Sequence, residues 1–161
     1  MQPGQHPRVA HPTLKQVLAQ KPRDLHVVDI DATVLDALRV MAERDVGAVL
    51  ILDGKRPVGL FTERDFARHT VSDGSPVHLT PVRQVMAGNI VFATPEQTVL
   101  QGMALMRERW LRYLTVLENG HPLGMLSIGD LLEEIIAYQE RVLNAIELDQ
   151  LVLFARGTYS C

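Results

Sequence analysis

The sequence has 161 residues, of which 47% are hydrophobic and 22% charged, and its formal net charge is −3. These values are typical of a globular protein with one shared core, and the lack of a basic run argues against a nucleic-acid surface. No apolar stretch approaches the roughly 20 residues that span a membrane, and a single cysteine, Cys161, excludes an internal disulfide. We therefore expect a cytoplasmic protein that has neither a membrane nor a nucleic acid as its partner.

The first predicted elements follow a short N-terminal tail, residues 1–12. Residues 26–30 predict a strand, and Thr33 then begins a helix in which Asp36 stands three residues later as a capping partner. The apolar side chains of this helix recur at the spacing of one helical face, and they are Val34, Leu38 and Met41.

A hairpin and a second helix come next. The apolar residues 48–52 predict a buried strand, the turn sequence at 53–57 closes a hairpin, and residues 58–61 form its second strand. Another helix is expected to begin near Glu63. This first unit therefore has the order strand, helix, strand, strand, helix.

The whole unit occurs a second time, 65 positions further along the chain. Residues 26–66 and 91–131 share ten identical positions out of 41, and the differing positions keep their apolar or polar character. Thr98 with Gln101 repeats the helix cap, and residues 114–117 and 123–126 repeat the hairpin. Such a duplication predicts two units packed about a pseudo-twofold axis, with equivalent grooves at the seam.

These boundaries define the expected organisation of the chain. The first repeat covers residues 13–71, a linker rich in serine, glycine and proline covers 72–81, and the second repeat covers 82–138. Residues 139–161 form a C-terminal helical extension. Because the last stretch is apolar on several faces, part of it is expected to pack on something beyond its own unit.

Both units end their last strand with the same heptapeptide pattern, at residues 59–65 and 124–130. In each, a glycine and two apolar residues are followed by Thr62 or Ser127 and, three residues later, by Asp65 or Asp130. A carboxylate on a first helical turn is favoured by the helix dipole, and it accepts hydrogen bonds from neighbouring sugar hydroxyls. The free N–H groups of the same turn suit a phosphate.

The duplicated unit with this heptapeptide resembles a tandem cystathionine-beta-synthase (CBS) domain pair, a Bateman-type module, over roughly residues 13–138. The resemblance implies an α+β fold of two βαββα repeats in one compact pair. It also implies a regulatory homodimer whose clefts bind an adenosine nucleotide (AMP, ADP or ATP), with S-adenosylmethionine or NADH ranked behind. No cofactor is required for such a role.

Four further side chains are candidate ligand contacts. Arg64 and Arg112 are the nearest phosphate partners, although each is also typical of a solvated or salt-bridged arginine. Tyr113 and Trp110, which flank Arg112, either line a base pocket or pack between the repeats. Because the first copy has Gly47 where the second has Arg112, the two clefts should differ.

Two interpretations of the heptapeptides stay open. In the first, Asp65 and Asp130 hold ribose, Thr62, Ser127 and Arg112 meet phosphate, and a partner protein reads the resulting change in orientation of the repeats. In the second, the aspartates only cap helices and the protein is a structural or interaction dimer with empty clefts. No metal-ligand spacing, phosphate loop or nucleophile motif is present, so we expect no enzyme activity.

Overall fold

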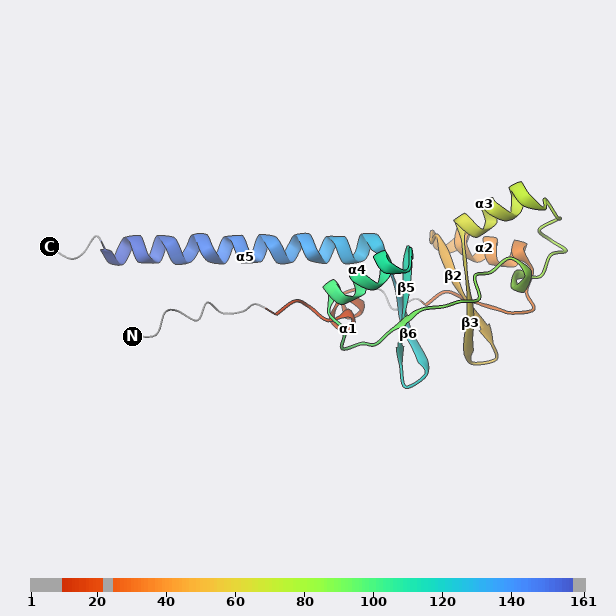
Figure 1. Ribbon diagram of the computed structural model, residues 1–161, viewed down its shortest axis with the longest axis horizontal. Coiled ribbons are helices and arrows are strands. Elements are labelled where there is room, and N and C mark those ends of the chain that lie inside the picture. The colour runs from red at the N-terminus through yellow and green to blue at the C-terminus, as the bar shows by residue number, and fades with distance from the viewer. Residues whose placement is uncertain (1–9, 22–24, 158–161) are drawn as a thin grey trace.

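The computed structural model describes residues 10–21 and 25–157 (Figure 1). The first nine residues of the predicted tail, and Cys161, lie outside the described part. Two three-stranded sheets stand side by side, each with helices packed on it, and one long helix extends away from them. The predicted α+β pair of repeats is confirmed.

The first repeat contains β1 (Val27–Asp29), α2 (Val34–Arg44), β2 (Ala48–Asp53), β3 (Arg56–Thr62) and α3 (Glu63–Ser72). Its sheet has the order β1-β2-β3, in which β1 runs parallel to β2 and β3 runs antiparallel to it. The parallel pair requires a crossover, which α2 supplies. This is the strand, helix, strand, strand, helix order predicted from the sequence.

The second repeat contains β4 (Phe92–Ala93), α4 (Val99–Glu108), β5 (Tyr113–Glu118), β6 (His121–Ser127) and α5 (Ile128–Gly157). The sheet order β4-β5-β6 and the strand directions match those of the first repeat. The hairpin register also matches, since both hairpins carry an irregularity at the same place, between Ile51 and Leu52 and between Val116 and Leu117.

The predicted helix caps form as expected. Thr33 accepts from the Asp36 backbone N–H, and the Asp36 carboxylate accepts in return from the Thr33 backbone N–H, which completes a capping box. Thr98 and Gln101 form the same box at the start of α4. Each box satisfies donors that the first turn of a helix would otherwise leave unpaired.

Two short segments complete the cores of the repeats crosswise. Helix α1 (Leu14–Ala19) precedes the first repeat but packs on the second, where Leu14 and Val17 are buried in the core. The 3-10 helix η1 (Val82–Gln84) precedes the second repeat, and Val82 is buried in the core of the first. Sequence analysis missed α1, because six residues give too short a pattern to reveal a helix.

Helix α5 runs for 30 residues, and only its beginning belongs to the body of the protein (Figure 1). Leu131 is fully buried in the second core, whereas Leu143 is 60% exposed and Phe154 is 77% exposed. Within the described residues, no helix is both long and apolar enough to cross a membrane. Among the described residues, none buries the apolar side chains Leu143 and Phe154 of the outer part of α5.

Candidate functional site

A pocket of about 640 Å³ lies at the seam between the two repeats. Residues 43–48, which join α2 to β2, line it from the first repeat, and Tyr113, Met125, Ser127 and Asp130 line it from the second. Lys21 and His26 complete the wall. The volume falls within the range of about 300–1,000 Å³ that is typical of small-molecule sites.

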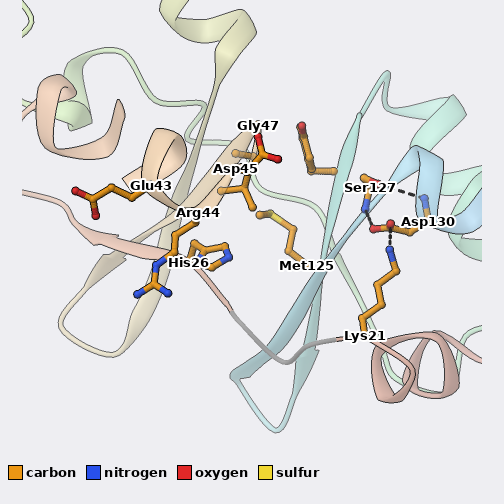
Figure 2. Close-up of a pocket in the computed structure, with 12 residues that line it drawn as sticks. Lys21, His26, Glu43, Arg44, Asp45, Gly47, Met125, Ser127 and Asp130 are labelled. Carbon is orange, nitrogen blue, oxygen red and sulfur yellow. Dashed lines mark hydrogen bonds and ion pairs between the residues drawn. The ribbon is translucent and has the colours of Figure 1, made fainter. Parts of the chain in front are cut away.

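Asp130 lies on the wall that the second repeat contributes to this pocket, close to Ser127 and Lys21 (Figure 2). One carboxylate oxygen accepts from the Ser127 backbone N–H at 2.7 Å, while the Ser127 hydroxyl accepts from the Asp130 backbone N–H at 3.2 Å. The other oxygen forms an ion pair with the ammonium group of Lys21. Since the Asp130 side chain is only 18% exposed, this is a partly desolvated pair with stronger electrostatics than a surface salt bridge.

The opposite wall belongs to the turn after α2. Asp45 ends that helix in the left-handed conformation, with φ of 52°, and the chain then turns through Gly47 into β2. Arg44 and His26 stand on this side of the pocket, across from Lys21 and Asp130 (Figure 2). Arg44 therefore adds positive charge to this wall, beside the carboxylates of Glu43 and Asp45, and Lys21 adds it to the other wall.

Tyr113 separates this pocket from a neighbouring one of about 460 Å³, which Glu63 and Phe66 also line. The phenol lies over Gly47, where any side chain would collide with it. Burial raises the pKa of the Tyr113 hydroxyl above its ordinary value of 10.0, and the Glu63 carboxylate adds to the rise because it disfavours a second negative charge. Tyr113 thus presents a neutral aromatic surface between the two hollows.

The heptapeptide of the first repeat has a different set of contacts. Asp65 accepts from both the backbone N–H and the hydroxyl of Thr62, at 2.9 and 2.7 Å, and the Asp65 backbone N–H donates to the same hydroxyl. Thr62 and Asp65 do not line the pocket at the seam. Their observed contacts are those of a capping box at the start of α3.

The other predicted residues are placed away from this pocket. Arg64 is exposed on the first turn of α3, and Arg112 is exposed immediately before β5; neither lines the pocket. Trp110 is 88% exposed, so the predicted packing of Trp110 between the repeats is wrong. Its backbone has φ of 56°, which turns the side chain outward at the end of α4.

The two heptapeptide glycines have a packing role in the structure. A methyl group at Gly59 would collide with Met86, and one at Gly124 would come within 2.7 Å of Leu18. The two glycines therefore admit the crosswise segments that complete each core.

Sequence analysis missed Lys21, His26 and Arg44. Lys21 and His26 lie outside the heptapeptides, and only the fold brings them to Asp130. For Arg44 a signal existed, because the pair Glu43-Arg44 recurs as Glu108-Arg109 in the second repeat. In the part of the chain that the structure describes, no group of three or more acidic, histidine or cysteine side chains is placed to hold a metal ion.

The fold and the pocket together define a tandem-repeat α+β module with a pocket of small-molecule size at the seam between its repeats. The family model of the CBS domain matches residues 20–72 and 82–137. The chain therefore belongs to the CBS-domain family, and it carries the domain twice.

Two similar proteins illustrate this membership. A CBS domain-containing protein of Arabidopsis thaliana, CBSX3, mitochondrial, is 31% identical over 134 residues, which cover 80% of this chain. The structure of a putative signal-transduction protein with CBS domains from Burkholderia ambifaria is 38% identical with a TM-score of 0.74, and the match covers 78% of this chain and 94% of that one. The chain spans 63% of the length of CBSX3 and about a fifth of the length of further Arabidopsis thaliana relatives.

Two more distant structures share the fold and contain ligands. A CBS domain protein from Pyrobaculum aerophilum, complexed with AMP, has a TM-score of 0.65 at 23% identity, covering 73% of this chain and 88% of that one. The CBS domain pair of protein MJ0100, in complex with methylthioadenosine and S-adenosylmethionine, has a TM-score of 0.71 at 14% identity, covering 80% and 99%. At these identities the likeness concerns the fold alone.

Proposed function

We propose that this protein is a non-enzymatic regulatory module that binds an adenosine nucleotide, AMP, ADP or ATP, in the pocket at the seam. The observation that carries the proposal is Asp130, a half-buried carboxylate on a first helical turn that faces a pocket with basic groups on both walls. A carboxylate suits the two ribose hydroxyls, and the cations suit phosphate. Two distant relatives of the same fold bind adenosine ligands, which supports this ligand class.

Within this proposal the residues have separate roles. Asp130 holds the ribose, the Ser127 hydroxyl meets the phosphate, and Tyr113 lies against the base. The repeat symmetry suggests a second cleft, in which Thr62 and Asp65 would take the places of Ser127 and Asp130. Arg112 and Arg64 are the proposed phosphate contacts of that cleft.

The test compares two aspartates that cap helices in the same way. Asp130→Asn keeps an oxygen for the Ser127 N–H but removes the charge, and Asp36→Asn does the same in the box at Thr33, which does not line the pocket. We expect calorimetry to show AMP affinity reduced about tenfold or more by Asp130→Asn and unchanged by Asp36→Asn. If the two substitutions changed the AMP affinity equally, Asp130 would act only as a helix cap.

A second candidate function, an interaction dimer with empty clefts, is favoured by the contacts of Asp65 and by α5. Asp65 is engaged in its own capping box, and α5 exposes apolar side chains far from the pocket. Absence of heat and of a thermal shift with millimolar AMP, ATP, NADH and S-adenosylmethionine would favour this candidate. S-adenosylmethionine and NADH are the less favoured ligands of the first.

We further propose that the protein acts as a homodimer through α5 and that a partner protein reads the relative orientation of the repeats. The exposed apolar side chains of α5 form a stripe at helical spacing, which one helix of a second copy could cover. These side chains include Leu132, Ile136, Leu143, Ile146 and Leu153. The cytoplasm remains the proposed location, which cell fractionation tests, and a single cysteine suits such a reducing compartment.

A further inference from the structure

Lys21 reaches the pocket from a part of the chain that carries no nucleotide-binding motif. It follows α1, and α1 is fixed to the second repeat by the buried side chains of Leu14 and Val17. Its ammonium group pairs with Asp130 at the side of the pocket that the second repeat lines (Figure 2). The backbone bonds Leu14 N–H to Gln97 O and Val82 N–H to Ala32 O show that the segments before the two repeats correspond with an offset of 68 residues. Lys21 therefore corresponds to Asn89, which has no charge, so this feature belongs to one cleft only.

The ion pair occupies the atom that a sugar would need. One oxygen of Asp130 already accepts from the Ser127 N–H, and the other is paired with Lys21. A ribose diol that donates one hydroxyl to each carboxylate oxygen must therefore share that second oxygen with the ammonium group or displace it. Because a carboxylate oxygen has two lone pairs, sharing is compatible with its geometry, but it weakens the ion pair.

A weakened ion pair leaves Lys21 in need of another anion. Its side chain is only 34% exposed, so a loss of its partner is not fully compensated by water. A phosphate attached to the same ribose provides that anion, in a pocket whose opposite wall carries Arg44 and His26. A neutral nucleoside provides none, and a sulfonium nucleoside adds a further positive charge.

We propose that Lys21 is a specificity-determining residue of this pocket, which exchanges part of its pairing with Asp130 for the phosphate of the ligand. The pocket then selects phosphorylated adenosine ligands over adenosine and over S-adenosylmethionine. This inference rests on the proposed function, since it presumes that an adenosine ligand occupies the pocket.

The experiment measures the affinities of AMP and of adenosine for the full chain by calorimetry. We expect AMP to bind at least about tenfold more tightly than adenosine, because a hydrogen bond to a charged group supplies that much discrimination. Lys21→Gln should bring the ratio close to one, mainly through weaker AMP binding, and Lys21→Arg should restore most of it. The matched control is Lys15→Gln in α1, the helix that Lys21 follows, since Lys15 pairs with Glu118 at 2.9 Å and does not line the pocket.

The outcomes separate this inference from the proposed function. If the unmodified protein binds AMP and adenosine equally, or if Lys21→Gln leaves the ratio unchanged, the role of Lys21 is overturned while nucleotide binding stands. If neither ligand binds the unmodified protein, both proposals fail. Should Lys21→Gln unfold the protein, the ratio measured with Lys21→Arg decides, because a role in selection requires it to stay near that of the unmodified protein.

Discussion

The phenol of Tyr113 in the second repeat lies over the α-carbon of Gly47 in the first, so that a methyl group at Gly47 would collide with the phenol oxygen. The contact joins the repeats directly at the wall of the pocket. It also explains why the first copy has glycine where the second has Arg112: a longer side chain would push Tyr113 out of its place.

We expect Gly47→Ala to lower the free energy of unfolding by about 1–3 kcal/mol through overpacking. In the background of Tyr113→Phe the loss should be smaller, because the colliding oxygen is absent and the next atom of the ring stands 3.4 Å from the new methyl group. Urea denaturation of the unmodified protein, the two single variants and the double variant gives the coupling energy between positions 47 and 113. Gly88→Ala is the control, since a methyl group there meets no atom within 4 Å. Additive losses would show that the contact is not tight in solution.

The stability of the protein should depend on Tyr113 at alkaline pH. Because the pKa of Tyr113 is raised above 10.0 by burial and by Glu63, the folded state favours the neutral phenol. Its contribution is fully present below pH 10 and is lost as the pH rises through the folded pKa. Denaturation between pH 8 and about pH 11.5 should show a steeper loss in the unmodified protein than in Tyr113→Phe. Parallel curves would contradict the burial of this hydroxyl.

Asp36 provides the matching prediction at acidic pH. Hydrogen bonds from Thr33, with a smaller contribution from Arg39, lower the pKa of Asp36 below 3.8. The stabilisation is therefore present above pH 3.8 and is lost as the pH falls through the folded pKa. The difference in stability between the unmodified protein and Asp36→Asn should shrink on acidification. In contrast, the effect of Gln101→Ala in the uncharged box of α4 should not change with pH.

The capping box at Thr62 should matter to stability whether or not a ligand binds. Thr62 both accepts from and donates to Asp65, so Thr62→Ala is expected to cost about 1 kcal/mol or somewhat more, and Thr62→Ser should recover most of it. Thermal unfolding without ligand measures this directly. A loss that appears only in the presence of nucleotide would instead assign Thr62 to a binding site.

Charge on the exposed face of α5 should separate the proposed dimer. Leu143→Glu with Ile146→Glu places two carboxylates in the apolar stripe, where both side chains are now 47–60% exposed. We expect light scattering to show half the mass of the unmodified protein, with the nucleotide affinity of the pocket retained. Asn144→Glu, an exposed neighbour in the same helix, is the control and should leave the mass unchanged.

Much of this fold was predictable because the duplication tests each element twice. The capping pairs Thr33 with Asp36 and Thr98 with Gln101 mark the same helix start in both copies, and the structure confirms both. The hairpin turns were equally clear. In the second hairpin, for example, Asn119 and Gly120 both adopt the positive φ that a tight two-residue loop requires. Local chemistry fixes such features within a few residues.

The site was predictable only in part, since its other members meet through tertiary structure. The heptapeptide identified Ser127 and Asp130, which line the pocket, but the same pattern at Thr62 and Asp65 makes a capping box elsewhere. Lys21 could not be predicted, because it follows a short helix that packs on the distant repeat. The exposure of Trp110 could not be predicted either, because it depends on a left-handed backbone conformation that no local sequence pattern indicates.

The crosswise placement of Val17 and Val82 makes the pair of repeats the smallest cooperative unit of this protein. A fragment that contains one repeat would keep its own sheet, but the short helix at its N-terminus would be the one that packs on the other repeat. Its own core would lack the helix that precedes the other repeat, and apolar side chains would be exposed there. Half a molecule of this kind should aggregate or pair with the complementary half when the two are mixed. Transfer of this module between proteins during evolution should accordingly move both repeats together, because one repeat alone lacks a complete core.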